Sequence, residues 1–227
     1  MKKNRIFKEN LTSKLLQREA FSVLKKMKNK NICEVGCGDG NISNYLINNL
    51  NYDHFYHLSD ISRIAIDKAK KKINYNQVFY RTGNLLAPWQ NKKFDIIISD
   101  VSSLSQIVAE RSPWYKGVAS NCGLDGLKNV KKILKKINVN LKPSGIFIIP
   151  LISLSNTYEL KRILRLKFGF FKETKKIYWP IPTFFQQNEI LFDKLLKKRI
   201  IYYEKKFGKY LAYTSVAICK KMKGQNA

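Results

Sequence analysis

Hydrophobic positions along the chain follow two alternating periods. Apolar residues recur every three or four positions in amphipathic segments, which predicts helices over 5–28, 41–50, 62–72, 125–140, 157–166 and 188–206. Compact apolar runs lie between them and predict strands over 32–35, 54–58, 77–81, 94–99, 146–149, 170–178 and 210–220. This alternation is typical of an α/β fold with a mainly parallel sheet and helices on both faces.

The chain has the size of a single domain. Its 227 residues contain no internal repeat and no low-complexity break. We therefore expect one domain over 1–227, made of an N-terminal helical extension (1–28) and a core (29–227). The longest nearly apolar run, Ile146 to Leu154, is about half of a membrane span, so we expect no membrane association. No apolar signal core follows the N-terminus, which favours a cytoplasmic protein, although the basic segment 1–28 also leaves an organellar presequence open.

A glycine-rich turn follows the first predicted strand. The turn has the pattern Glu34-x-Gly36-x-Gly38-x-Gly40, and a helix is expected from about Asn41. Glycines allow a sharp turn with φ > 0 and leave bare backbone against which a ligand can lie. The start of the next helix offers unpaired N–H groups. This order of strand, acid, turn and helix predicts a ligand site.

The spacing separates two ligand classes. Dinucleotide sites require G-x-G-x-x-G/A, and the last small position of that pattern falls on Asn41. A pyrophosphate also has no use for the acid at Glu34, whereas S-adenosylmethionine carries an ammonium and a sulfonium. The pattern resembles the first motif of the class I S-adenosylmethionine-dependent methyltransferases. That resemblance implies a Rossmann-like, seven-stranded mixed sheet with an antiparallel last strand. It also implies S-adenosylmethionine as cofactor, with its methionine moiety held by Glu34, Gly36, Cys37, Gly38 and Gly40.

Two further strand ends extend the expected cofactor site. Asp60 falls about twenty residues beyond the glycine turn, where related folds place a carboxylate on ribose hydroxyls, and Ile61 follows it. Asp60 also suits a helix N-cap, and one residue can do both. Asn84 and Leu85 follow the third strand, where methyltransferases of this class often bind the adenine edge. A plain turn at Asn84 is the alternative.

The fourth predicted strand ends in an acid. Phe94 to Ser99 is a buried run, and Asp100 follows it at the edge where parallel strands place their ligands. We therefore expect Asp100 to be the catalytic residue that orients or deprotonates the acceptor. Aromatic residues at 112–115 and 179–185 are candidate walls of the acceptor pocket. The segment 179–185 reaches that pocket if the sixth strand runs parallel to its neighbours and so ends at the same edge of the sheet. Packed connections are the alternative.

A narrower resemblance covers about residues 30 to 150. Gly83-Asn-Leu-Leu, Phe94 to Asp100, Gly123-Leu-Asp-Gly-Leu127 and the run from Leu141 are similar to the release-factor glutamine methyltransferases. Those enzymes carry Asn-Pro-Pro-Tyr after strand four, where this chain has Asp-Val-Ser-Ser (100–103). The prolines and aromatic ring that hold an amide substrate are therefore replaced, and an amine, hydroxyl or carboxyl acceptor becomes an alternative.

The charge points to a polyanionic partner. The chain has 43 Lys and Arg against 16 Asp and Glu, a formal net charge of +27. Such a field favours RNA or ribosomes, although a merely basic surface from a biased composition is an alternative. The cysteines form no C-x-x-C pair, and His54 and His57 fit a structural role, so we expect no metal.

These observations leave three functions open. The first is methyl transfer to a nitrogen or oxygen of a protein, related to translation. The second is methyl transfer to RNA. The third is a non-enzymatic nucleic-acid-binding protein that retains the fold. The sequence does not fix the oligomeric state.

Overall fold

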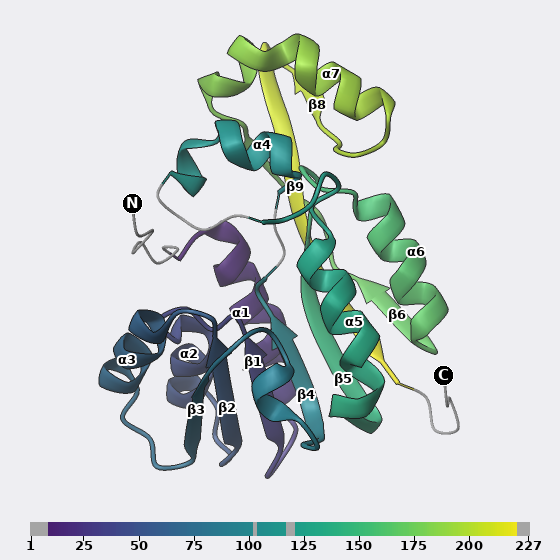
Figure 1. Cartoon of the computed structure of the whole chain (residues 1–227). Coiled ribbons are helices and arrows are strands. Elements are labelled where there is room, and N and C mark those ends of the chain that lie inside the picture. Colours follow the sequence, from purple (N-terminus) through teal and green to yellow (C-terminus); the bar gives the residue numbers. More distant parts are fainter. Residues whose placement is uncertain (1–8, 102–103, 117–120, 222–227) are drawn as a thin grey trace.

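A computed structural model of the chain describes residues 9–101, 104–116 and 121–221 (Figure 1). Its centre is a mixed sheet with the strand order β3-β2-β1-β4-β5-β9-β6, and β7 and β8 also pair with β9. The strands are β1 (Asn31–Val35), β2 (Phe55–Asp60), β3 (Val78–Thr82), β4 (Phe94–Ser99), β5 (Leu141–Ile152), β6 (Phe170–Glu173), β7 (Ile177–Pro180), β8 (Glu204–Lys206) and β9 (Lys209–Lys220).

Helices follow most of the strands. They are α1 (Leu11–Leu24), α2 (Asn41–Asn49), α3 (Arg63–Lys72), α4 (Gln106–Arg111), α5 (Lys128–Asn140), α6 (Thr157–Lys167) and α7 (Glu189–Lys197). Short 3-10 turns are η1 (Ala87–Trp89), η2 (Pro113–Tyr115) and η3 (Thr183–Asn188). Among the described residues, no helix has both the length and the apolar character needed to cross a bilayer.

The alternating side chains of the strands build two hydrophobic layers. Ile96 and Ile98 of β4 point to the layer that α1, α2 and α3 cover, whereas Ile97 points to the layer under α5 and α6. A third cluster joins α4, η3, α7 and the end of β9 that lies at the top of Figure 1. The sheet thus has helices on both faces, as the sequence predicted.

Strand direction places the candidate site. β3, β2, β1, β4 and β5 run parallel, so their carboxyl ends meet at one edge of the sheet. β9 is antiparallel to β5, as expected for the last strand. The expectation of seven strands is wrong in number. The described sheet has nine strands because the strand expected near 170–178 divides into β6 and β7, and because β8 was not foreseen.

Several element boundaries also differ from those expected. α1 ends at Leu24 rather than 28, and residues 5–8 of the expected helix lie outside the described part of the chain. β5 begins at Leu141 rather than at 146, and its first part shifts register against β4 and has a positive φ at Ser144. β5 also continues to Ile152, beyond the expected strand end at 149.

The C-terminal region differs most. A helix was expected over 188–206, but α7 ends at Lys197 and Glu204–Lys206 forms a hairpin with β9. Gly208, at φ 69°, makes the tight turn of that hairpin. The expectation that strand six is parallel to its neighbours is also wrong, because β6 and β7 pair with β9 and are antiparallel to it. Only pairing across the sheet, and not local pattern, decides these elements.

Candidate cofactor and acceptor site

The glycine turn after β1 has the geometry that its sequence predicts. Gly36, Gly38 and Gly40 have φ values of 74°, 55° and 78°, which disfavour residues with a side chain. The N–H groups of Gly36 and Cys37 donate to the carbonyl of Ser59 at 2.8 and 3.1 Å, which ties the turn to the end of β2. A Cβ on Gly40 would lie 2.8 Å from Cδ1 of Ile73. The turn is therefore fixed between two strand ends and α3.

Glu34 makes a contact within the protein. Its carboxyl group is buried and accepts hydrogen bonds from the backbone N–H of Ser43, at 3.0 Å, and from the Ser43 hydroxyl. Burial, together with the nearby Asp100 and Asp60, raises the pKa of Glu34 to about 8 against the lowering effect of the Ser43 hydrogen bonds. The acid thus links β1 to the first turn of α2. Its role toward the methionine moiety stays a prediction.

Asp60 holds the glycine turn from the adjacent strand. Its Oδ2 accepts from the Gly38 N–H at 3.0 Å and its Oδ1 accepts from the Ser62 N–H at 2.8 Å. The alternative role as N-cap is wrong, because Ser62 caps α3 by accepting from the N–H of Ala65. Each oxygen of Asp60 keeps a further lone pair for a ligand. Ile61 beside it is 73% exposed, an unusual state for a large apolar side chain and suited to covering a ring.

Asn84 and Leu85 lie next to the end of β2. The carbonyl of Asn84 accepts from the Ala87 N–H at 3.0 Å, so the turn expected as an alternative at this residue is present. Leu85 has a positive φ of 53°, and its carbonyl accepts from the Ser59 hydroxyl at 3.2 Å. The expected adenine-binding residues are therefore joined through Ser59 to the strand that carries Asp60. Contact of Asn84 with adenine stays a prediction.

Asp100 lies at the end of β4 and contacts the N-terminal helix. Its Oδ2 accepts a 2.7 Å hydrogen bond from the hydroxyl of Ser13. Burial raises the pKa of Asp100 to about 6, and the Ser13 hydrogen bond opposes this increase. Ser102 and Ser103, which align with the last two tetrad positions, lie outside the described residues.

Carboxyl groups gather at this edge of a strongly basic protein. Glu34 and Asp60 lie at the carboxyl ends of β1 and β2, and Asp100 follows the adjacent β4. Each of the two aspartates is close enough to raise the pKa of Glu34. The negative charge of the aspartates fits a cationic ligand, whereas Glu34, with its raised pKa, is mainly protonated at neutral pH. The bare backbone of the glycine turn and the carboxyl cluster therefore suit S-adenosylmethionine, with its ammonium and sulfonium. Nothing in this set requires a phosphate.

The contribution of α1 was not foreseen. Ser13 reaches Asp100, and the Gln17 amide donates to the carbonyl of Asn41, at 3.4 Å, at the start of α2. Both residues are buried polar positions on an otherwise amphipathic helix. Their polarity on the buried face is the only signal in the sequence, and it does not identify their partners.

Two aromatic segments meet beside this edge. The ring of Trp114 packs edge-on against the rings of Trp179 and Phe184, with centroids 5.6 Å away in both cases. Trp179 belongs to β7, and its Nε1 donates to the Thr214 hydroxyl at 3.0 Å. The Thr214 hydroxyl lies 3.5 Å from that of Thr12, the residue before Ser13. A chain of contacts therefore connects the aromatic cluster of Trp114, Trp179 and Phe184 to Asp100.

The histidines lie away from this edge. His54 Nδ1 accepts from the Lys30 N–H at 3.1 Å, and His57 stacks on Phe79. In the described part of the chain, no group of three or more His, Cys, Asp or Glu side chains could hold a metal ion, and the cysteines form no disulfide.

Comparisons with known proteins agree with this geometry. A family model described as "Methyltransferase domain" matches residues 26–212. No curated protein sequence matches the chain.

Solved structures of similar fold come from several methyltransferases. A 16S rRNA methyltransferase of T. thermophilus, in complex with AdoMet and guanosine, superposes with a TM-score of 0.59 at 14% identity, over 94% of this chain. This chain spans only 44% of the length of that protein. A Plasmodium falciparum protein assigned as a ribosomal RNA methyltransferase superposes with a TM-score of 0.56 at 17% identity, over 96% of this chain and 100% of the other. A ribosomal protein L11 methylase from Lactobacillus delbrueckii superposes with a TM-score of 0.53 at 15% identity, over 93% of this chain and 80% of the other. At these identities the likeness concerns the fold.

Proposed function

Because the chain belongs to the methyltransferase-domain family, among the class I S-adenosylmethionine-dependent methyltransferases, we propose that it transfers a methyl group to a base of RNA. The observation that carries this proposal is the aromatic cluster of Trp114, Trp179 and Phe184. Trp114 is 37% exposed although two rings hold it, and contacts through Thr214 and Thr12 lead from the cluster to Asp100. A partly exposed aromatic ring that is connected to the candidate acceptor site in this way suits a nucleobase, which would stack on it.

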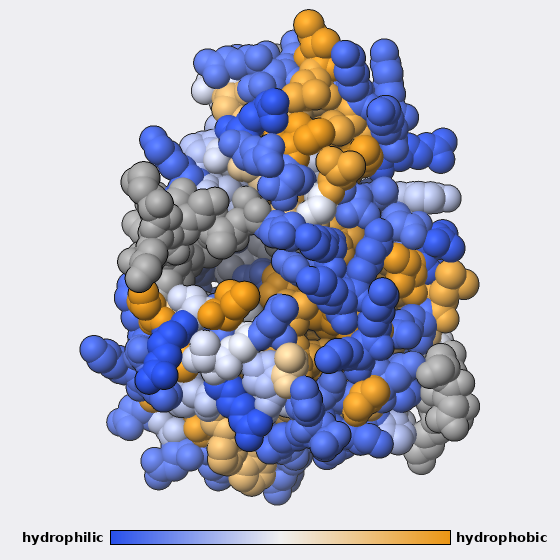
Figure 2. All heavy atoms as spheres, in the orientation of Figure 1, coloured by the Kyte–Doolittle hydropathy of each residue, from blue (hydrophilic) through white to orange (hydrophobic). Residues whose placement is uncertain are grey.

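The surface charge supports the same acceptor. The net charge of +27 favours binding to RNA through release of counterions. Hydrophilic residues cover most of the face in Figure 2, which suits contact with a polar, charged backbone. The similar fold of two proteins described as ribosomal RNA methyltransferases is in keeping with this proposal.

Each residue at this edge of the sheet would have a separate role in binding the cofactor or the acceptor. S-adenosylmethionine supplies a methyl group that is already activated on a positive sulfonium, so the protein contributes mainly position and orientation. Asp60 would accept from ribose hydroxyls and Asn84 from the adenine amino group, with Ile61 and Leu85 against the ring. Glu34 and the glycine turn would lie at the methionine moiety.

Asp100 would act on the acceptor. Its pKa of about 6 leaves the group mostly ionised at neutral pH, so it can accept a hydrogen bond or a proton from a base nitrogen. Ser13 occupies Oδ2 and holds the carboxylate in one orientation. The remaining oxygen, Oδ1, would face the acceptor.

A protein acceptor is the other candidate, carried by the Gly-Leu-Asp-Gly-Leu element over 123–127. In the structure this element is a turn before α5. Gly123 and Gly126 both have φ 76°, and Asp125 accepts from the Leu127 N–H at 2.9 Å and pairs with Lys131. These contacts account for the element without an acceptor. We therefore place the protein acceptor second.

Methyl-labelled S-adenosylmethionine distinguishes the two acceptors. The full chain would be incubated with labelled cofactor and a lysate that lacks the endogenous enzyme. Separate samples of the labelled product would then be digested with ribonuclease or with protease. We expect label that ribonuclease releases and protease does not. Label released only by protease would overturn the RNA acceptor. The variant Asp100→Asn serves as the inactive control, because it keeps the shape of the side chain but not its charge.

A further inference from the structure

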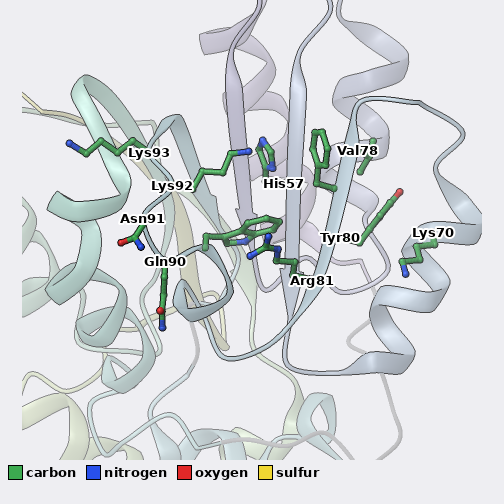
Figure 3. Close-up of a pocket in the computed structure, with 11 residues that line it drawn as sticks. His57, Lys70, Val78, Tyr80, Arg81, Gln90, Asn91, Lys92 and Lys93 are labelled. Carbon is green, nitrogen blue, oxygen red and sulfur yellow. The ribbon is translucent and has the colours of Figure 1, made fainter.

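A cavity is lined by residues other than those expected to bind the cofactor. It has a volume of about 690 Å³ and opens along the edge strand β3 (Figure 3). None of the residues that line it belongs to the glycine turn, to the ends of β2 and β4, or to the aromatic cluster. The residues that the argument uses are His57, Phe79, Arg81, Trp89, Lys92 and Lys93.

The cavity is positively charged without compensation. Lys70, Arg81, Lys92 and Lys93 line it and no Asp or Glu does. Within residues 9–101, 104–116 and 121–221, none of these cations forms an ion pair with a carboxylate, although the chain forms such pairs elsewhere. The Arg81 guanidinium is held in place, since it donates to the carbonyl of Pro88 and lies over Trp89 with 4.8 Å to the ring centroid. An arginine fixed in this way is prepared for an anion.

Aromatic rings accompany the cations. Phe79 is 47% exposed on β3, and one side of it stacks on His57 with centroids 4.8 Å apart and an interplanar angle of 11°. Lys92 Nζ lies 5.3 Å from the Phe79 centroid. In Figure 3 Lys92 extends toward His57, whereas Tyr80 and Lys70 lie on the other side of β3. Cations interleaved with an exposed ring are typical of surfaces that bind single-stranded nucleic acid.

Two buried nitrogen atoms at the cavity have no partner. Nδ1 of His57 and Nε1 of Trp89 make no hydrogen bond within the described structure, and both side chains are nearly inaccessible, at 1% and 2%. Nε2 of His57 lies 3.3 Å from Oδ1 of Asn31, so the unpaired atom is the one on the other side of the ring. Buried polar groups are normally satisfied, and these two unpaired nitrogens belong to residues that line the cavity.

The protonation of His57 reflects the same excess of charge. Burial, together with the nearby Lys92 and Arg81, lowers its pKa to about 4. No carboxylate opposes them. An anion in the cavity would raise the pKa of His57.

Protection of the edge strand does not account for these features. A lysine that points to solvent is sufficient to prevent pairing of an edge with another strand. Such protection needs neither a hollow nor a fixed arginine, and it leaves no buried nitrogen unpaired. The arrangement at β3 contains all three.

We propose that this cavity binds a nucleotide of a single-stranded RNA segment, with Arg81, Lys92 and Lys93 on its phosphates and Phe79 against its base. The proposal rests on the proposed RNA acceptor and assigns a second contact site for the same substrate, apart from the site of methyl transfer.

A charge-matched pair of variants tests the site. Lys92→Gln/Lys93→Gln removes two charges at the cavity, and Lys25→Gln/Lys26→Gln removes two exposed charges at the end of α1. Binding of a fluorescein-labelled single-stranded RNA of about 12 nucleotides would be followed by anisotropy at about 50 and 200 mM salt. We expect the cavity pair to weaken binding at least about fivefold and to reduce the salt slope by about 0.7–1.4, and the control to change affinity less than about twofold. In the unmodified chain, RNA containing 4-thiouridine should cross-link to Phe79 or Trp89.

The outcomes separate this site from the proposed function. Methylation of RNA by the unmodified chain, with equal losses in both variant pairs or with cross-links only elsewhere, would overturn the cavity site and leave the RNA acceptor standing. Absence of both RNA methylation and RNA binding would overturn the RNA acceptor and the cavity site together.

Discussion

The hydroxyl of Ser13 donates a 2.7 Å hydrogen bond to Oδ2 of Asp100 and so joins residues 87 positions apart in the chain. Ser13 lies in the first turn of α1 and Asp100 follows β4. Because a hydrogen bond to an ionised carboxylate favours its charged form, α1 influences the group that we propose acts on the acceptor. The N-terminal helix is therefore part of the candidate site.

Replacement of Ser13 should shift the pH dependence of methyl transfer. Activity that needs the Asp100 carboxylate increases as pH rises through its pKa of about 6. Ser13→Ala removes a contact that lowers this pKa, so we expect the acidic limb to move upward by up to about one unit, with recovery at higher pH. Steady-state rates between about pH 5 and 9 measure this. Ser22→Ala, an exposed serine of α1, is the control, and an unshifted limb in Ser13→Ala would contradict the role of the contact.

Glu34 should make the folded state less stable as pH rises. Its folded pKa of about 8 is above the ordinary 4.5, so the folded state holds a proton that the unfolded state has released in this range. The contribution is complete below about pH 4.5 and is lost toward pH 8. We expect the free energy of unfolding to fall by about 1–2 kcal/mol between about pH 6.5 and 8.5, and Glu34→Gln to abolish that decrease.

Denaturant unfolding at both pH values measures the effect. Asp100→Asn is the control, because the pKa of Asp100, about 6, lies below this window and the decrease should persist in that variant. A decrease of equal size in Glu34→Gln would show that another group is responsible.

Asp60 should be needed for cofactor binding and for the glycine turn. Asparagine offers one acceptor oxygen in place of two, so Asp60→Asn leaves the N–H of Gly38 or of Ser62 without its partner. We expect S-adenosylmethionine affinity by calorimetry to fall at least about tenfold and the free energy of unfolding to fall by about 1 kcal/mol. Asp67→Asn on α3 is the control. Unchanged affinity would remove Asp60 from the cofactor site.

Gly40 should tolerate no side chain, for two separable reasons. Gly40 and Gly208 have similar φ values, 78° and 69°, but a Cβ on Gly40 meets Ile73 at 2.8 Å whereas one on Gly208 meets nothing within 4 Å. We expect Gly208→Ala to cost about 1 kcal/mol of unfolding free energy and Gly40→Ala about 2–4 kcal/mol, since it adds steric overlap to backbone strain. Denaturant unfolding measures both. Equal losses of unfolding free energy in the two variants would show that the residues around Gly40 move to make room for the added methyl group.

Trp114 should affect the acceptor and not the cofactor. If a base stacks on the aromatic cluster, Trp114→Ala should lower kcat/KM for RNA at least about tenfold and leave S-adenosylmethionine affinity unchanged. Trp114→Phe should retain part of the activity, because it keeps a ring. Phe207→Ala removes a ring that is 99% exposed and should have no effect. Full activity in Trp114→Ala would remove the cluster from acceptor binding.

The sequence by itself determined the features that depend on neighbouring residues. The bounds of β4, the start of α2 at Asn41 and the positive φ values of Gly36 and Gly40 follow from local period and backbone freedom. The positions of Asp60 and Asp100 at strand ends follow in the same way, because parallel strands bring their carboxyl ends to one edge. The fold and the acidic residues of the site were therefore predictable.

Only the tertiary structure decided which distant residues meet. The hydrogen bond between Ser13 and Asp100, the packing of Trp114 on Trp179 and the basic cavity at β3 all join segments that are remote in the chain. Local pattern also misassigned β8, because a short strand becomes stable only when β9 satisfies its backbone groups. Burial, hydrogen bonding and charge between such segments depend on how the elements pack, and no spacing within one segment encodes them.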